Sequence, residues 1–253
     1  MDNRIGIQLY TLRDFCQTIE DFDKTCEKVS KMGYKTVQLS GIGNFPAKDI
    51  KEILDKYSLE VVCTHRPPVN YLENLEDEIE FHKTLGCKIC GLGRLPQKEI
   101  SIEAVEELAE NFIPVIKKLE ENNLVFAYHN HAFEFQKFNG KHYFEIIKEK
   151  LTSDNFKFIL DVYWLSVAGI NPAKFIKEHS DDIACIHLKD LMLQGNKPCY
   201  APVGKGNLDW DEILSACEAS GAMYALVEQD TCDGDPFDCI KESYSYISNK
   251  GYK

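Results

Sequence analysis

A unit of two parts recurs eight times along this chain: a short apolar or β-branched run, followed by a longer segment of helical periodicity. The short runs predict buried strands, and the charged, amphipathic stretches between them predict helices that bury one face. Strands that alternate with helices form a parallel sheet, because each helix returns the chain to the edge where the next strand begins. The predicted strands are Ile5–Tyr10, Thr36–Leu39, Glu60–Thr64, Lys88–Leu92, Val125–His129, Phe158–Leu160, Ala184–Leu188 and Ala225–Glu228.

The clearest helical patterns lie at Ile19–Met32, Ala47–Tyr57, Ser101–Asn122 and Asp209–Ser220. Each places apolar side chains on one face and charged side chains on the other, as outer helices do. Pro114 lies inside the longest of the four, so a kink or a break is expected there.

Eight such units either close into a barrel or lie in an open, doubly wound sheet. An open sheet of the Rossmann type has a G-x-G-x-x-G turn after its first strand, whereas Ile5–Tyr10 is followed by Thr-Leu-Arg-Asp. No linker rich in Pro, Gly or Ser divides the 253 residues. We therefore predict an α/β fold, a (β/α)8 TIM barrel that forms a single domain over residues 1–253. The longest stretch without an assigned element, Leu191–Leu208, follows the seventh strand and is expected to cover an active site as a loop.

Charge and composition exclude several classes of protein. The chain has 29 Lys and Arg against 41 Asp and Glu, a net charge of −12, and no clustered basic stripe, so no nucleic-acid partner is expected. It has neither an amino-terminal signal core nor a run of 18 apolar residues, which predicts a cytoplasmic protein without a membrane partner. The ten cysteines are expected to be reduced, and the pair Cys87 and Cys90 is interpreted as two small residues in a buried strand.

Imidazole and carboxylate side chains lie at or just after the ends of four consecutive predicted strands: Glu134, Asp161, His187 and Glu228. A charged residue at the end of a barrel strand is unfavourable unless it faces the open carboxyl-terminal rim, so these side chains are expected to meet there. Converging carboxylates repel one another, and a divalent cation is the simplest species that neutralises them. An oxygen-rich site with one imidazole suits Mn²⁺, Mg²⁺ or Co²⁺, and it also accepts Zn²⁺. We predict one such metal ion, bound by these four residues.

Several alternatives stay open at this stage. Asp161 could instead cap the helix that follows it, and Glu228 could pair with Lys189. His129 and His131 lie two residues apart, share one face of a strand and could bind metal themselves. Two more nitrogens would overfill a site that already has three carboxylates, so His131 is predicted to face the substrate. The role of His129 is left open.

The order and number of the motifs also resemble those of a known family. The motifs are YHNHAFEF at 128–135, LD at 160–161, IHLKD at 186–190 and VEQD at 227–230, supported by GIQLYTLR at 6–13 and VGKGNLDW at 203–210. Together they resemble the sugar phosphate isomerase/epimerase family, the xylose isomerase-like TIM barrels that include inosose dehydratase and ketose 3-epimerases.

The resemblance implies a divalent metal held by Glu, Asp, His and Glu from the last four strands, which here fall on Glu134, Asp161, His187 and Glu228. One departure concerns the ketose 3-epimerases, whose first metal Glu lies about six residues earlier relative to this motif, where this chain has Tyr128. The arginine that those enzymes carry after the metal His is also absent here. The assignment of Glu134 therefore rests on the relatives similar to inosose dehydratase. The resemblance also implies a homodimer.

The chemistry predicted from these residues is a metal-dependent isomerisation or epimerisation of a sugar or sugar phosphate through a metal-stabilised enediolate. Glu134 and Glu228 are the predicted acid and base. A lyase or dehydratase acting on a keto-polyol would use the same site, and a metal-free sugar-binding barrel is a third reading. A DNA-cutting barrel is disfavoured by the charge of −12. The residues predicted to bind the sugar or polyol are His65, His131, Lys189 and Trp164.

Overall fold

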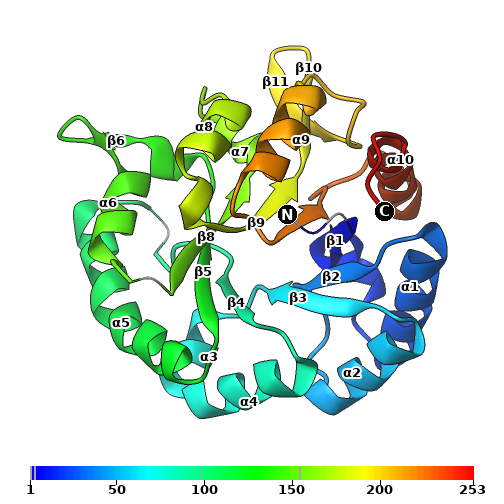
Figure 1. Ribbon diagram of the computed structural model, residues 1–253, viewed down its shortest axis with the longest axis horizontal. Coiled ribbons are helices and arrows are strands. Elements are labelled where there is room, and N and C mark those ends of the chain that lie inside the picture. Colours follow the sequence, from blue (N-terminus) through cyan, green and yellow to red (C-terminus); the bar gives the residue numbers. More distant parts are fainter. Residues whose placement is uncertain (1, 3, 98, 154) are drawn as a thin grey trace.

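A computed structural model describes residues 2, 4–97, 99–153 and 155–253. Its parallel strands form a closed barrel in the order β1-β12-β9-β8-β5-β4-β3-β2, which confirms the predicted fold (Figure 1). The barrel strands are β1 (Gly6–Gln8), β2 (Thr36–Leu39), β3 (Glu60–Thr64), β4 (Ile89–Leu92), β5 (Val125–His129), β8 (Phe156–Asp161), β9 (Ile183–Leu188) and β12 (Tyr224–Val227).

Helices surround the strands as an outer ring (Figure 1). The α-helices are α1 (Ile19–Met32), α2 (Ala47–Lys56), α3 (Pro68–Glu73), α4 (Leu75–Leu85), α5 (Ile102–Glu121), α6 (Tyr143–Lys150), α7 (Val162–Val167), α8 (Pro172–Glu178), α9 (Trp210–Ala219) and α10 (Pro236–Asn249). The four helical patterns singled out in the sequence correspond to α1, α2, α5 and α9. Pro114 lies inside α5 without breaking it. None of the helices in the described part of the chain is long and apolar enough to cross a membrane.

Local signals set where these elements begin and end. The Thr18 side chain accepts the backbone N–H of Asp21 at the start of α1, and Gly33 ends the helix with a φ of 112°, a conformation that glycine adopts without strain. The first strand is shorter than predicted. The Gln8 side chain accepts the N–H of Tyr10 and starts the 3₁₀ segment η1 (Leu9–Phe15), so the last two residues of the predicted strand turn away from the sheet. The other 3₁₀ segments are η2 (Phe133–Phe135) and η3 (Ser180–Asp182).

The stretch Leu191–Leu208, predicted to be a loop, largely consists of an antiparallel hairpin. Its strands β10 (Asp190–Gln194) and β11 (Lys197–Ala201) pair from Asp190 with Ala201 to Gln194 with Lys197. Gly195, at a φ of 61°, lies in the two-residue connection, where hairpin turns require a residue that tolerates positive φ. A second, shorter hairpin joins β6 (Lys137–Phe138) and β7 (Lys141–His142).

The barrel interior has an apolar floor beneath its carboxyl-terminal end. The side chains of this floor come from six different barrel strands: Val62, Cys63, Ile89, Ala127, Ile159, Ala184, Cys185 and Leu226. Small and branched side chains fill the narrow interior and leave the ends of the strands as the layer that can carry polar groups. Cys87 and Cys90 are buried at and just before β4, as their interpretation as core residues requires.

Candidate active site

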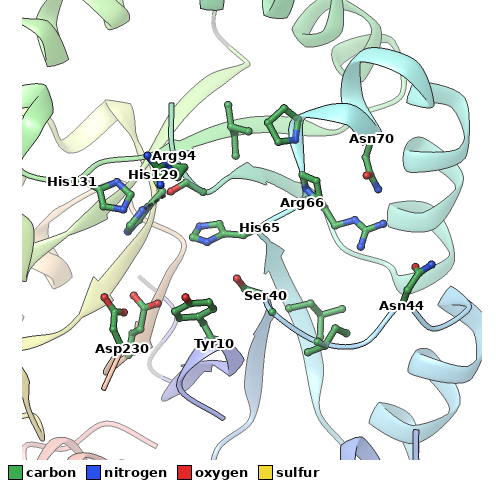
Figure 2. A pocket seen from close by; sticks show the side chains of 18 of the residues that line it. Tyr10, Ser40, Asn44, His65, Arg66, Asn70, Arg94, His129, His131 and Asp230 are labelled. Atoms are coloured by element: carbon green, nitrogen blue, oxygen red, sulfur yellow. Dashed lines mark hydrogen bonds between the residues drawn. The ribbon is translucent and has the colours of Figure 1, made fainter. Parts of the chain in front are cut away.

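A cavity of about 710 Å³ lies at the carboxyl-terminal ends of the barrel strands (Figure 2). Loops after β2, β3 and β4 form one part of its wall, and the ends of β5, β9 and β12 form the other. The predicted substrate-binding residues His65, His131, Trp164 and Lys189 all line it, and so does Glu228. The polar rim expected from the sequence is therefore a real concave site.

Four buried side chains at this end of the barrel could hold a metal ion. Ligand atoms of His129, Asp161, His187 and Glu228 all lie within 4.8 Å of one another, and no part of these residues is substantially exposed. The structure thus brings together three of the four predicted ligands, and His129 completes the group.

Glu134, the fourth predicted ligand, is not a member of this group. Its Oε1 accepts a hydrogen bond from the Tyr128 hydroxyl at 2.7 Å, and its Oε2 accepts the backbone N–H of His131 at 2.8 Å. The physical reason is the 3₁₀ turn η2, which contains Glu134 and brings its carboxylate to the Tyr128 hydroxyl and the His131 backbone. Burial raises the pKa of Glu134 to about 7.

The His129 ring is anchored on one side and faces a carboxylate on the other. Its Nδ1 lies 3.0 Å from the carbonyl oxygen of Gly93, which can only accept, so Nδ1 carries the hydrogen. The other nitrogen, Nε2, lies 3.3 Å from Oδ2 of Asp161. Burial opposes charge on this ring, but Asp161 raises the pKa of His129 above its usual value. A positive species, either a proton or a metal ion, is therefore favoured between the two atoms.

The His187 ring is arranged in the same way, with one nitrogen anchored by a hydrogen bond and the other facing a carboxylate. Its Nε2 donates to Oε1 of Gln38 at 2.7 Å, while Nδ1 lies 2.9 Å from Oε2 of Glu228. Burial lowers the pKa of His187, which favours the neutral ring with a lone pair on Nδ1. A lone pair that faces a carboxylate oxygen at this distance needs a cation between the two atoms. Metal-binding histidines in proteins are oriented in this way, by a hydrogen bond from the other ring nitrogen.

Lys189 supplies part of the positive charge in the site. Its Nζ lies 2.9 Å from Oδ2 of Asp161, 2.8 Å from Oε2 of Glu228 and 2.9 Å from Oδ1 of Asp230. Burial disfavours the ammonium group, but these carboxylates outweigh burial and raise the pKa of Lys189 well above its usual value. One ammonium against three carboxylates leaves a formal charge of −2, which a divalent cation would neutralise. The pairing of Glu228 with Lys189, one of the alternatives from the sequence, is present.

Asp161 uses its two oxygens for different purposes. Oδ1 accepts the backbone N–H groups of Tyr163 at 2.9 Å and Trp164 at 3.2 Å, so the residue does cap α7. Oδ2 faces His129 and Lys189. The two interpretations left open for this residue are therefore compatible, and the cap holds the carboxylate in a fixed orientation.

The remaining imidazoles of the cavity are neutral. Burial lowers the pKa of His65 well below its usual range and lowers that of His131 to about 3. The His131 ring stacks on Phe133 with a centroid distance of 5.3 Å, and it lies 5.3 Å from Trp164. Its buried Nδ1 has no hydrogen-bond partner among the described residues. A neutral ring held in this way can bind a substrate hydroxyl.

Sequence reasoning missed Gln38 and Asp230. Asp230 had a usable signal, because it lies two residues after Glu228 and such residues share one face of an extended chain. Gln38 is a single polar residue in an otherwise apolar strand, and nothing local shows that it contacts a histidine 149 positions away.

A closed barrel of parallel strands with its polar cluster at the carboxyl-terminal ends belongs to the class of TIM barrels, whose enzymes have their active sites at that end. Within that class, the sequence model described as a xylose isomerase-like TIM barrel matches residues 26–248. The chain belongs to this family. It matches none of the curated proteins with which it was compared.

Solved structures with the same fold carry the names of isomerases, epimerases and a dehydratase. A sugar phosphate isomerase/epimerase from Parabacteroides distasonis superposes with a TM-score of 0.82 at 18% identity, over 100% of this chain and 98% of that one. A probable 3-DHS dehydratase from Bacillus anthracis has a TM-score of 0.76 at 13% identity, over 98% and 99%. An L-ribulose 3-epimerase has a TM-score of 0.75 at 15% identity, over 98% and 94%. At these identities the likeness concerns the fold.

Proposed function

We propose that this protein is a divalent-metal-dependent isomerase or epimerase that acts on a sugar or sugar phosphate through an enediolate. The observation that carries the proposal is the pair of anchored histidines. His129 and His187 each donate one ring N–H to a protein oxygen. The other ring nitrogen faces a buried carboxylate, that of Asp161 for His129 and that of Glu228 for His187. This is a donor set built to surround a cation.

The proposed ligands are His129, Asp161, His187 and Glu228. Two imidazoles and two carboxylates favour Mn²⁺, Co²⁺ or Zn²⁺ over Mg²⁺, which prefers oxygen ligands. The bound cation would polarise the substrate oxygens next to it and stabilise the negative charge that develops when a carbon-bound proton is removed. The excess negative charge of the group, described above, supports a divalent ion over a monovalent one.

The chain's own residues carry the proton transfer and the binding. Burial works against ionisation of Glu228, but the Lys189 ammonium group holds its pKa well below the usual range, so the carboxylate is ionised and is the proposed proton acceptor. Lys189 offers an ammonium group to a developing oxyanion. His65 and His131 are placed to bind hydroxyls, and Trp164 to stack against the sugar ring. Glu134 does not line the cavity, so we assign it the positioning of His131 in place of the predicted acid role.

The test is hydrogen exchange at the carbon next to the carbonyl. Protein stripped with a chelator and reloaded with Mn²⁺, Co²⁺ or Zn²⁺ is incubated in D₂O with ketoses, ketose phosphates and keto-inositols, and deuterium incorporation is followed by NMR. We expect incorporation that requires metal and falls at least about 100-fold in Glu228→Gln, because losing a general base typically costs 10²–10⁴-fold. Lys24→Gln, on the exposed face of α1, is the matched control.

Two outcomes would change the assignment. An enone absorbance that appears with a keto-polyol would show that the same enediolate expels a β-hydroxyl group, which makes the protein a dehydratase. Elemental analysis that finds no metal after loading would overturn the metal-dependent function itself.

A further inference from the structure

The cavity has a second polar end that the proposed chemistry does not use. Figure 2 shows Asn44, Arg66 and Asn70 on one side of His65, opposite His131 and Asp230. Arg66 follows β3, and Asn70 lies in α3. The acidic side chains that line the cavity in the described part of the chain, Glu228 and Asp230, both follow β12 and are paired with Lys189. The end around Arg66 is therefore free of carboxylates on its lining.

Arg66 is held through one edge of its guanidinium group. Its Nε donates to both carboxylate oxygens of Glu78, at 2.9 and 3.1 Å. The Glu78 side chain is only 2% exposed, and it also accepts a hydrogen bond from Nδ2 of Asn70 at 2.8 Å. The guanidinium carbon lies 4.2 Å from the centroid of the Phe81 ring, which also lines the cavity. The ion pair and the aromatic face together restrict the side chain to one orientation.

Within the described part of the chain, the terminal edge of the same guanidinium group has no hydrogen-bond partner. Among the described residues, no acceptor is hydrogen-bonded to Nη1 or Nη2 of Arg66, although 22% of the side chain is exposed and it lines the cavity. Asn70 donates its amide hydrogen to Glu78, which leaves its Oδ1 as an acceptor. A guanidinium fork that is already oriented binds a planar or tetrahedral anion with little further loss of side-chain entropy.

We propose that this end of the cavity is a subsite for an anionic group, carboxylate or phosphate, carried by the substrate at a distance from its reacting carbon. Nη1 and Nη2 of Arg66 would bind two oxygens of the anion, while Glu78 and Phe81 hold the guanidinium group in place. The inference that the substrate is an anionic sugar or polyol rests on the proposed function. Binding itself depends on neither metal nor turnover.

The test compares equilibrium binding of D-glucose, D-glucuronate and D-glucose 6-phosphate by calorimetry, with no metal added. The two charged probes distinguish a carboxylate from a phosphate subsite. We expect at least one of them to bind about 10- to 100-fold more tightly than glucose, since a charge-assisted, two-point hydrogen bond contributes on this scale. In Arg66→Gln this preference should fall to within about threefold, and Arg66→Lys should lose most of it because a single ammonium cannot form the fork.

Arg66→Gln leaves Glu78 buried without its ion-pair partner, so the double variant Arg66→Gln, Glu78→Gln is measured beside it and the folding of both is checked by thermal melting. Lys24→Gln removes one positive charge far from the cavity and should keep the preference. Arg94 is a second arginine that lines the cavity. A preference that disappears in Arg94→Gln and survives in Arg66→Gln would overturn the subsite. Equal affinity for the neutral and charged probes, or absence of binding by both charged probes, would overturn it as well. Failure to load metal would overturn the proposed function and leave this result intact.

Discussion

At the scale of single residues, spacing along a strand decides which side chains reach the site. His129 and His131 differ by two positions and both line the cavity, one as a member of the four-residue group and the other as a neutral ring beside Trp164. Glu134 is only three residues further on, yet it belongs to a turn and contacts Tyr128 instead. Its carboxylate is buried, and this burial is the reason for its raised pKa.

This raised pKa makes stability depend on pH in a predictable direction. Glu134 ionises near 4.5 in the unfolded chain and near 7 in the folded one, so the native state binds more protons between these values. The contribution of Glu134 protonation to the unfolding free energy is fully present below about pH 4.5 and is lost as the pH rises through 7. It amounts to about 3 kcal/mol by the linkage relation.

The measurement is urea unfolding of the wild type and of Glu134→Gln at pH 5 and pH 8. All other titratable groups are shared, so the difference in unfolding free energy between the two proteins reports on residue 134 alone. As the pH rises, Glu134→Gln should become more stable relative to the wild type. Glu52→Gln, on an exposed part of α2, should show no such gain. A difference that stays constant with pH would contradict the assignment of a protonated Glu134.

At the scale of elements, Asp190 connects the end of β9 to the start of α9. Its carboxylate accepts the indole N–H of Trp210 at 2.7 Å and the backbone N–H groups of Gly204 and Gly206 at 2.8 and 3.0 Å. A Cβ on Gly206 would lie 2.4 Å from Oδ1 of Asp190, so only glycine lets the chain approach so closely. This carboxylate orders the segment that follows the β10–β11 hairpin.

Replacing Asp190 with Asn should loosen that segment, because one amide oxygen cannot replace two carboxylate oxygens and the amide N–H groups would face backbone donors. We expect a loss of about 2–4 kcal/mol in unfolding free energy, the scale of buried polar groups left unsatisfied. Hydrogen exchange should accelerate over 201–210 and stay unchanged in α5. Asp209→Asn is the matched control, because asparagine caps a helix as well as aspartate does. Equal protection in both variants would argue against the role given to Asp190.

At the scale of the whole molecule, three of the proposed ligands lie in β5, β8 and β9, and the fourth, Glu228, directly follows β12. These strands are adjacent in the barrel order β12-β9-β8-β5, although residues 129 and 228 are far apart in the sequence. A cation bound there would join one continuous arc of the barrel. Metal binding is therefore expected to stabilise the fold as well as to support the chemistry.

Stripping the protein with a chelator and adding Mn²⁺ at about 100 times its dissociation constant should stabilise the folded state by about 2.7 kcal/mol. For a chain of this size that corresponds to a rise of about 5–10 °C in Tm, read by calorimetry. The rise should vanish in His129→Ala, where a ligand is lost, and persist in Glu134→Gln, where none is. The opposite pattern would restore Glu134 to the ligand set.

The alternation of eight apolar runs with helical segments was sufficient to predict the closed barrel, because hydrophobic periodicity is a local property of the chain. The same pattern located Asp161, His187 and Glu228 at the ends of consecutive strands, since parallel strands end at one edge. That His129 and not Glu134 lies in the buried four-residue group depended on the tertiary structure: Glu134 belongs to a three-residue turn, and only the approach of distant strands shows which side chains meet. The contact of Lys189 with three carboxylates was likewise decided in three dimensions, because side-chain direction and distance across the barrel are not encoded in spacing along the sequence.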